Sequence, residues 1–130
     1  METITKESVL TFVADNPMEL NATHARLCVP IIDRIYRKMR VGMRFNKIKV
    51  ADGLICDGHH RYLASLLANA SIERMSGIKT SATEVVEWES VIFEEHDWDS
   101  PTKIKLLNQY DAEYNNIPLE ILLERITFIL

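Results

Sequence analysis

Apolar residues recur along this chain at two spacings, and each change of spacing marks an expected boundary between elements. Residues 5–14 and 30–40 repeat apolar side chains at the helical spacing. Pro30 suits a first helical turn and Gly42 suits the position after a helix end, so we predict helices over both stretches. The buried face of the first helix is expected to hold Val9, Leu10, Phe12 and Val13.

The middle of the chain changes from strand spacing to helical spacing. Residues 47–50 and 54–56 are two short, mostly apolar runs joined by an Ala-Asp-Gly turn, which is typical of a β-hairpin. Residues 62–69 consist mainly of strong helix formers and predict a buried helix directly after the hairpin.

The second half predicts a further strand region and two more helices. Residues 83–95 are rich in β-branched and aromatic residues, so we expect one long strand or a bent pair. Ser100 as N-cap and Pro101 as first residue predict a helix over 101–114, and a second proline begins a last apolar helix over 119–130. The residues expected to face inward are Val86, Trp88, Ser90 and Ile92 in the strand and Ile104, Leu107 and Tyr114 in the helix.

These elements predict a small α+β fold, a short mixed sheet flanked by helices. The 130 residues are expected to form a single domain, with residues 100–130 as a C-terminal helical extension. The last helix ends on Phe128, Ile129 and Leu130, which are expected to dock on the body of the protein, on a partner protein or on a second copy.

Composition indicates a globular protein rather than a disordered or membrane-spanning one. The chain is 47% apolar, contains no apolar run of the ~18 residues that a membrane helix needs, and does not begin with a basic-then-apolar signal segment. Its two cysteines, Cys28 and Cys56, lie in apolar surroundings and are expected to be buried thiols, which favours the cytoplasm.

The net charge of −4 hides an uneven distribution. Residues 1–65 contain ten Lys and Arg against seven Asp and Glu, whereas residues 66–130 contain five against twelve. Residues 34–49 carry seven basic side chains and no acidic one, so we expect either a solvated face or an attraction for anions. The acidic second half argues against general binding to duplex DNA, because that affinity comes mainly from neutralised phosphates.

The most informative segment is Asp57-Gly58-His59-His60-Arg61, at the join between the hairpin and the next helix. Imidazole, guanidinium and backbone N–H groups at a helix start suit a phosphate, and Gly58 allows the ligand to approach the backbone closely. The alternative is a plain helix cap by Asp57 among surface polar residues. We expect Gly58, His59, His60 and Arg61 to bind phosphate, with Arg44 and Lys47 from the basic segment.

Successive histidines diverge, so only one of His59 and His60 is expected to point into the site. His60 is the candidate general base or phosphate ligand, and Arg61 is the candidate stabiliser of phosphoryl charge. Asp57 would orient a histidine or hold Mg²⁺ through which a nucleotide binds. His24 and His96 lack metal-ligand spacing, so no protein metal site is predicted, and Cys56 is assigned to the core.

This segment, continued by Tyr62-Leu63-Ala64, resembles the box of the ParB/sulfiredoxin superfamily, in which a Gly-containing, Arg-ending box opens a helix after short strands. The close likeness covers about residues 30–70. The string is also similar to ParB-like domains of bacterial polymorphic toxins, as are residues 87–91, 97–99 and 107–115. His59 stands where sulfiredoxins have cysteine, and the Glu-Arg-Arg of ParB is absent, which excludes sulfiredoxin chemistry and weakens a partitioning role.

The resemblance implies a phosphate-binding α/β fold and a phosphate-ester hydrolase or nuclease of toxin type, in the cytoplasm or delivered to a target cell. The alternatives are a non-catalytic nucleotide-binding module and an immunity or adaptor protein that acts through protein contacts. The last of these would use the acidic residues between 84 and 99. A ββα metal nuclease, with Asn69 as the further ligand, is a weaker interpretation of the same segment.

Overall fold

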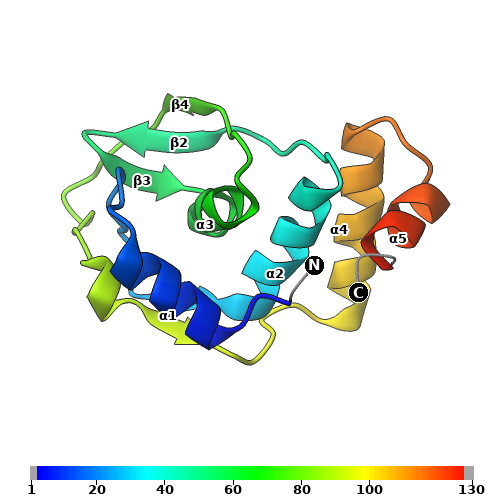
Figure 1. Ribbon diagram of the computed structural model, residues 1–130. Coiled ribbons are helices and arrows are strands. Elements are labelled where there is room, and N and C mark those ends of the chain that lie inside the picture. The colour runs from blue at the N-terminus through cyan, green and yellow to red at the C-terminus, as the bar shows by residue number, and fades with distance from the viewer. Residues whose placement is uncertain (1–2, 128–130) are drawn as a thin grey trace.

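The polypeptide alternates helices with short strands, and the computed structural model describes residues 3–127 of it (Figure 1). The predicted small α+β fold is confirmed, with five α-helices, a three-stranded mixed sheet and a separate parallel strand pair. The α-helices are α1 (Lys6–Asp15), α2 (Val29–Arg40), α3 (His59–Ala68), α4 (Pro101–Tyr114) and α5 (Leu119–Thr127). No helix within these residues is long and apolar enough to cross a membrane.

The larger sheet is built around the predicted hairpin. Strand β2 (Ile48–Ala51) is central, antiparallel to β3 (Leu54–Asp57) and parallel to β4 (Arg74–Ser76). Asp52 and Gly53 both have positive φ, +51° and +74°, as the tight turn of a hairpin requires. The second sheet pairs β1 (Arg26–Cys28) with β5 (Ile92–Glu94) in parallel.

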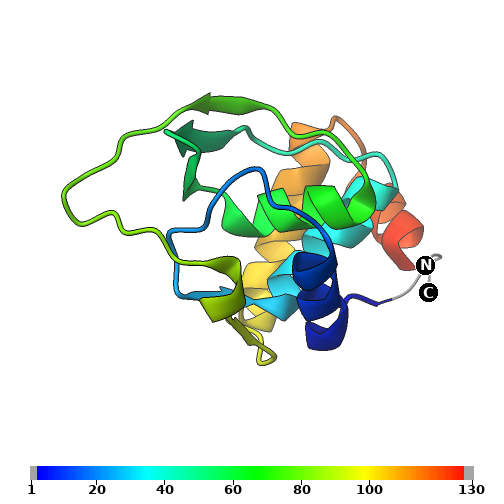
Figure 2. The same ribbon diagram turned by 60° about the vertical axis from the view of Figure 1, so that its left-hand side comes forward.

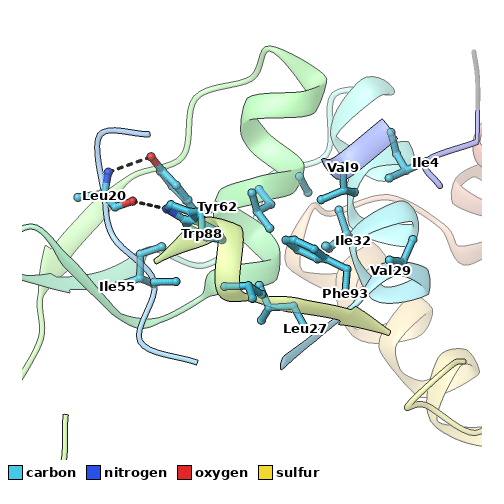
Figure 3. Packing of buried hydrophobic residues seen from close by; sticks show 14 of the residues in the cluster. Ile4, Val9, Leu20, Leu27, Val29, Ile32, Ile55, Tyr62, Trp88 and Phe93 are labelled. Atoms are coloured by element: carbon cyan, nitrogen blue, oxygen red, sulfur yellow. Dashed lines mark hydrogen bonds between the residues drawn. The ribbon is translucent and has the colours of Figure 1, made fainter. Parts of the chain in front are cut away.

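The main core lies between these sheets and helices α1, α2 and α3 (Figure 3). Leu27, Ile32, Ile55 and Leu63 are fully buried, and Phe93 is 2% exposed. Two aromatic side chains hold the loop before β1 against this core. The Tyr62 hydroxyl accepts a hydrogen bond from the Leu20 N–H at 3.2 Å, and the Trp88 indole N–H donates to the Leu20 carbonyl at 2.9 Å.

Helices α4 and α5 attach to the rest of the protein on one side, beyond α2 (Figures 1 and 2). Their buried apolar residues are Ala112 and Leu122, which form a small second cluster with Met43, and Leu119 and Ile126 pack against it. The described part of α5 therefore packs within the chain. Residues 128–130, on which the expected protein partner or homodimer contact falls, lie outside the described residues.

Several helix boundaries agree with the local signals. Thr5 caps α1 with a reciprocal Thr5–Ser8 capping box, Pro30 lies in the first turn of α2, and Ser100 caps α4 through the Lys103 N–H. Gly42, just past the end of α2, has φ of +89°. Helix α3 begins at His59, three residues before the predicted start, so both histidines belong to the helix.

The predicted strand over residues 83–95 is wrong. Val86 forms an isolated bridge with Ala22, Trp88–Ser90 is a 3-10 helix (η1), and only β5 is a strand. The 3-10 turn places the Trp88 ring in the core, and the strand after it runs with the opposite alternation from the one predicted. Ile92 is 48% exposed, whereas its neighbour Phe93 is buried.

Three residues on the α-helices that were expected to face inward are exposed, one on α1 and two on α4. Leu10 on α1 is 44% exposed, and on α4 Leu107 and Tyr114 are 36% and 40% exposed. The buried positions of α4 are Asp111 and Ala112 instead. Strands β1 and β4 are each three residues long and were not predicted. β4 is exposed at all three positions and β1 buries two successive residues, so neither strand shows the alternation of buried and exposed positions that predicts a strand.

The opposite exposure of Ile92 and Phe93 gives a stability test. Truncating a buried aromatic side chain removes its burial and leaves a cavity, so Phe93→Ala should lower the free energy of unfolding by about 3–5 kcal/mol. Ile92→Ala should lower it by no more than about 1 kcal/mol, because the side chain is half exposed. Chemical denaturation of both variants measures this difference, and equal losses would contradict the observed register of β5.

Candidate functional site

The candidate site is built on the first turn of α3. Gly58 occupies the N-cap position with φ of +103° and provides no side-chain cap, so the first-turn N–H groups depend on other acceptors or on a ligand. A Cβ at this position would lie 2.5 Å from Ile48 Cγ2 and 3.0 Å from the Arg61 guanidinium. Glycine is therefore required here both for its backbone conformation and for the space against β2.

A groove of about 870 Å³ opens over this helix start. One wall comes from the hairpin and β4, another from α2, and the third from α4 and the segment before it. Among the sequence-predicted residues, the lining includes Asp57, Gly58, His59, His60, Arg61 and Lys47. Arg44 is the exception, because it does not line the groove. Its backbone N–H and carbonyl are instead bonded to the Asn115 side chain at 2.6 and 2.9 Å.

The two histidines diverge, as predicted, and each is bound to a different backbone N–H, but both line the groove, whereas only one was expected to point into the site. The His59 Nε2 accepts from the Thr23 N–H at 2.9 Å, and the His60 Nε2 accepts from the Cys28 N–H at 2.9 Å. In both rings the proton therefore lies on Nδ1. Together they fasten the start of α3 to the loop before β1 and to the end of β1.

Both imidazoles are neutral at physiological pH. Burial lowers the pKa of His59 to about 3, helped by the neighbouring His24 and His60. Burial also lowers the pKa of His60 to about 4, and the effect of His24 is partly opposed by Asp99. His24 stacks on His59 with ring centroids 4.0 Å apart, and Trp98 contacts His60 edge-on at 5.4 Å.

These contacts change the expected role of His60. A general base needs a free lone pair and a pKa near the working pH, whereas the His60 Nε2 is engaged and its pKa is about 4. What a neutral His60 retains at the groove is the Nδ1–H, which is a hydrogen-bond donor. The residue is suited to binding an anion and holding the fold rather than to taking a proton.

Arg61 is also committed to the structure. Its guanidinium donates to the Asn46 carbonyl at 2.7 Å, the Lys47 carbonyl at 3.1 Å and the Asp57 carboxylate at 3.1 Å. Asp57 was expected to orient a histidine, but it pairs with Arg61 instead. The Asp57–Arg61 pair links the end of β3 to the first turn of α3 and leaves the carboxylate 61% exposed.

Three of the seven basic residues of the segment, Arg34, Lys38 and Lys47, pair with acidic residues from distant positions, and Arg37 pairs with the nearby Asp33. Arg34 binds Asp97 at 2.5 Å and Asp99 at 2.8 Å, and Lys38 binds Asp111 at 2.7 Å. The last pair is nearly buried, with Lys38 4% and Asp111 9% exposed. Arg34 and Lys38 thus join α2 to α4 and the segment before it through ion pairs. Neither a solvated basic face nor an attraction for anions, the two expectations for this segment, includes such ion pairs.

The sequence analysis missed the wall that α4 contributes. Trp98 and Tyr110 line the groove and are 42% and 51% exposed. Residues 97–99, just before the predicted helix start at Ser100 and Pro101, were noted for their similarity to toxin-associated domains and not as site residues. An exposed tryptophan between two carboxylates is an unusual cap, and that feature was the available signal. Nothing local to Tyr110 indicated which face of α4 it would occupy.

The donor groups at the helix start do not form a protein cage for Mg²⁺. Asp57 is the one carboxylate there, and it is paired with Arg61. Within residues 3–127 no three His, Cys, Asp or Glu side chains gather as metal ligands. Cys28 and Cys56 are free thiols, buried and half-buried respectively, so Cys56 lies at the margin of the core rather than inside it.

Comparison of the chain with family models, curated proteins and solved structures finds no match. The resemblance to the ParB/sulfiredoxin superfamily therefore stays a prediction from the helix-opening box alone.

The steric cost of a side chain at position 58 can be measured separately from the cost of its backbone conformation. Gly58→Ala places a Cβ on a left-handed residue and also against Ile48, whereas the Cβ of Gly42→Ala, at φ +89°, meets no atom within 4 Å. Backbone strain alone should cost about 1–2 kcal/mol of unfolding free energy at Gly42. The clash should add a further cost of about 1–3 kcal/mol at Gly58. Denaturation curves that show equal costs would contradict the tight contact with β2.

The neutral histidines predict a strong loss of stability in acid. The unfolded chain takes up protons near pH 6.5, whereas folded His59 and His60 take them up only near pH 3 and pH 4. The unfolded state therefore binds more protons between these values, and stability falls as the pH is lowered from about 6.5 to about 4. Urea denaturation across this range should show the fall, and His60→Gln should make it shallower. An unchanged slope in that variant would contradict a neutral, buried His60.

Proposed function

We propose that this chain binds a phosphate-bearing ligand, a nucleotide or a nucleic-acid phosphate, in the groove over the start of α3. The observation that carries the proposal is the uncapped first turn of α3, which lies in the lining of a groove with an excess of basic side chains. Backbone N–H groups at a helix N-terminus and nearby cations both favour an anion.

Binding rather than catalysis is the activity that the contacts favour. His60 and Arg61 were expected to act on phosphate, but the Nε2 of His60 and both terminal nitrogens of Arg61 are engaged in holding α3 to the rest of the fold. The groove still presents the N–H groups of the helix start, the Nδ1–H of the neutral His60 and the Lys49 ammonium to a ligand. Among the functions left open by the sequence, the non-catalytic phosphate-binding module fits this arrangement better than a phosphate-ester hydrolase or nuclease.

A phosphate-ester hydrolase or nuclease, the activity that the family resemblance implies, is the second candidate. One observation favours it. The Asp57 carboxylate lies at the groove beside the helix start and is 61% exposed, where it can accept a proton from an attacking water. Release of inorganic phosphate or cleavage of an oligonucleotide, measured on the samples used for binding, distinguishes the two candidates.

Lys49 gives the direct test of phosphate binding. Its side chain lines the groove, and its backbone lies opposite that of Asp57 in the β2–β3 register, next to Gly58. Its ammonium group forms no ion pair within the described residues. We expect phosphate ligands at ten times Kd to add about 1.4 kcal/mol to the free energy of unfolding of the native chain. That addition should raise Tm by about 2–6 °C in a thermal-shift assay.

Lys49→Glu should abolish this shift, because it places a negative charge beside the helix start. Lys105→Glu makes the same change of net charge on α4 outside the groove and should keep the shift. A native chain that no nucleoside mono-, di- or triphosphate stabilises, with or without Mg²⁺, would refute the proposal. So would equal shifts in the two variants.

A further inference from the structure

The charges in the groove limit how much negative charge a ligand can bring. Five basic side chains and three carboxylates line it, an excess of two positive charges, and the two buried histidines are neutral. The basic residues are Arg34, Lys38, Lys47, Lys49 and Arg61, and the acidic residues are Asp57, Asp99 and Asp111.

The local pairing reduces this excess further. Asp97, outside the lining, binds Arg34 with both carboxylate oxygens, and Glu73 lies 3.5 Å from the Lys47 ammonium. Lys49 is the one lining cation without an ion pair in the part of the chain that the structure describes. With Asp97 and Glu73 counted, the five basic side chains face five carboxylates, so Lys49 and the uncapped helix start are what the groove offers to an anion, which suits one phosphate group rather than several.

A buried donor at the helix start points to the same kind of ligand. His59 lines the groove and is 2% exposed, and its Nδ1 carries a proton because the Nε2 accepts from Thr23. Across residues 3–127 this Nδ1 is the one fully buried side-chain nitrogen or oxygen without a hydrogen-bond partner. Buried donors normally have an acceptor, and a phosphate oxygen at the first turn of α3 would supply one.

The wall that α4 and the segment before it contribute is aromatic and apolar, and it begins beside the helix start, where Trp98 contacts His60. Trp98, Tyr110 and Tyr114 line it together with apolar side chains from α2, and Tyr110 and Tyr114 stack at 6.2 Å. These aromatic rings are between 40% and 51% exposed. An exposed aromatic wall beside a small positive charge suits a ligand with a flat ring at one end and an anion at the other.

We propose that the groove takes a phosphate monoester whose organic part contains an aromatic ring, with one phosphate at the start of α3 beside Lys49 and the ring against Trp98 and Tyr110. The proposal rests on the proposed phosphate-binding function and names the ligand class for the same groove. A polyphosphate brings more negative charge than the lining balances, and inorganic phosphate leaves the aromatic wall unused.

Calorimetric titration of the full chain with four probes tests this ligand class: inorganic phosphate, phenyl phosphate, a nucleoside monophosphate, and the matching triphosphate with and without Mg²⁺. Phenyl phosphate and the monophosphate should bind at least about tenfold more tightly than inorganic phosphate, a gain expected for one stacked ring. The monophosphate should bind at least as tightly as the triphosphate.

Two variants on α4 locate the ring. Tyr110→Ala should remove most of the gain of phenyl phosphate over inorganic phosphate and leave the affinity for inorganic phosphate unchanged. Leu106→Ala is the matched control, because Leu106 lies on the same helix, is 62% exposed and does not line the groove. It should change neither affinity. Circular dichroism on both variants verifies that α4 remains folded.

The outcomes separate this inference from the function on which it rests. Tighter binding of the triphosphate, or equal binding of phenyl phosphate and inorganic phosphate, would overturn the inference while phosphate binding itself stands. A loss in Leu106→Ala as large as in Tyr110→Ala would also overturn it. Failure of every probe to bind would refute the proposed function and the inference together.

Discussion

Two neutral imidazoles hold the start of α3 in place, and the rest of the site depends on them. Each Nε2 accepts a backbone N–H that would otherwise lack a partner, one at Thr23 and one at Cys28. A buried N–H without an acceptor costs free energy comparable to a lost hydrogen bond, so these two contacts constrain the register of the helix against β1 and the loop before it. Burial disfavours the charged form of both rings, and protonation would also replace both acceptors with donors, so burial and the two contacts favour the same neutral state.

The same constraint explains why residues that look catalytic serve here mainly as structure. A helix that opens on Gly58 has no side-chain cap, and Arg61 instead fixes its first turn by donating to the loop before β2 and to Asp57. These hydrogen bonds leave few N–H groups of the guanidinium free for a substrate. What remains available at the helix start, among the described residues, is backbone N–H, the Nδ1–H groups of His59 and His60, and a Lys49 without an ion pair, a set of donors suited to an anion.

The groove lies where α4 joins α2 through ion pairs and a small second apolar cluster, outside the main core. Arg34 and Lys38, one turn apart on α2, bind carboxylates from before and within α4. The main core contains no residue of α4 or α5 among the described residues. Apolar side chains on α4 therefore face a cleft instead of a core, and this leaves Tyr110 and Trp98 accessible to a ligand.

Local signals were sufficient for the elements whose ends carry special residues. The Asp-Gly turn, the prolines at two helix starts and the Thr5–Ser8 cap act within a few residues, so the hairpin, α1, α2, α4 and the helix-opening box could be predicted from sequence.

The partners of those elements could not be predicted from sequence. Whether residues 83–95 formed a strand depended on the bond between Trp88 and Leu20, 68 positions apart. Whether the basic segment bound a ligand or its own chain depended on Asp97, Asp99 and Asp111, and the roles of His59 and His60 depended on two backbone N–H groups more than 30 residues away. Sequence determined where this chain turns and begins its helices, because those effects are local. Only the tertiary structure decided which polar groups were already satisfied, because hydrogen bonds and ion pairs are made with whatever the fold brings near.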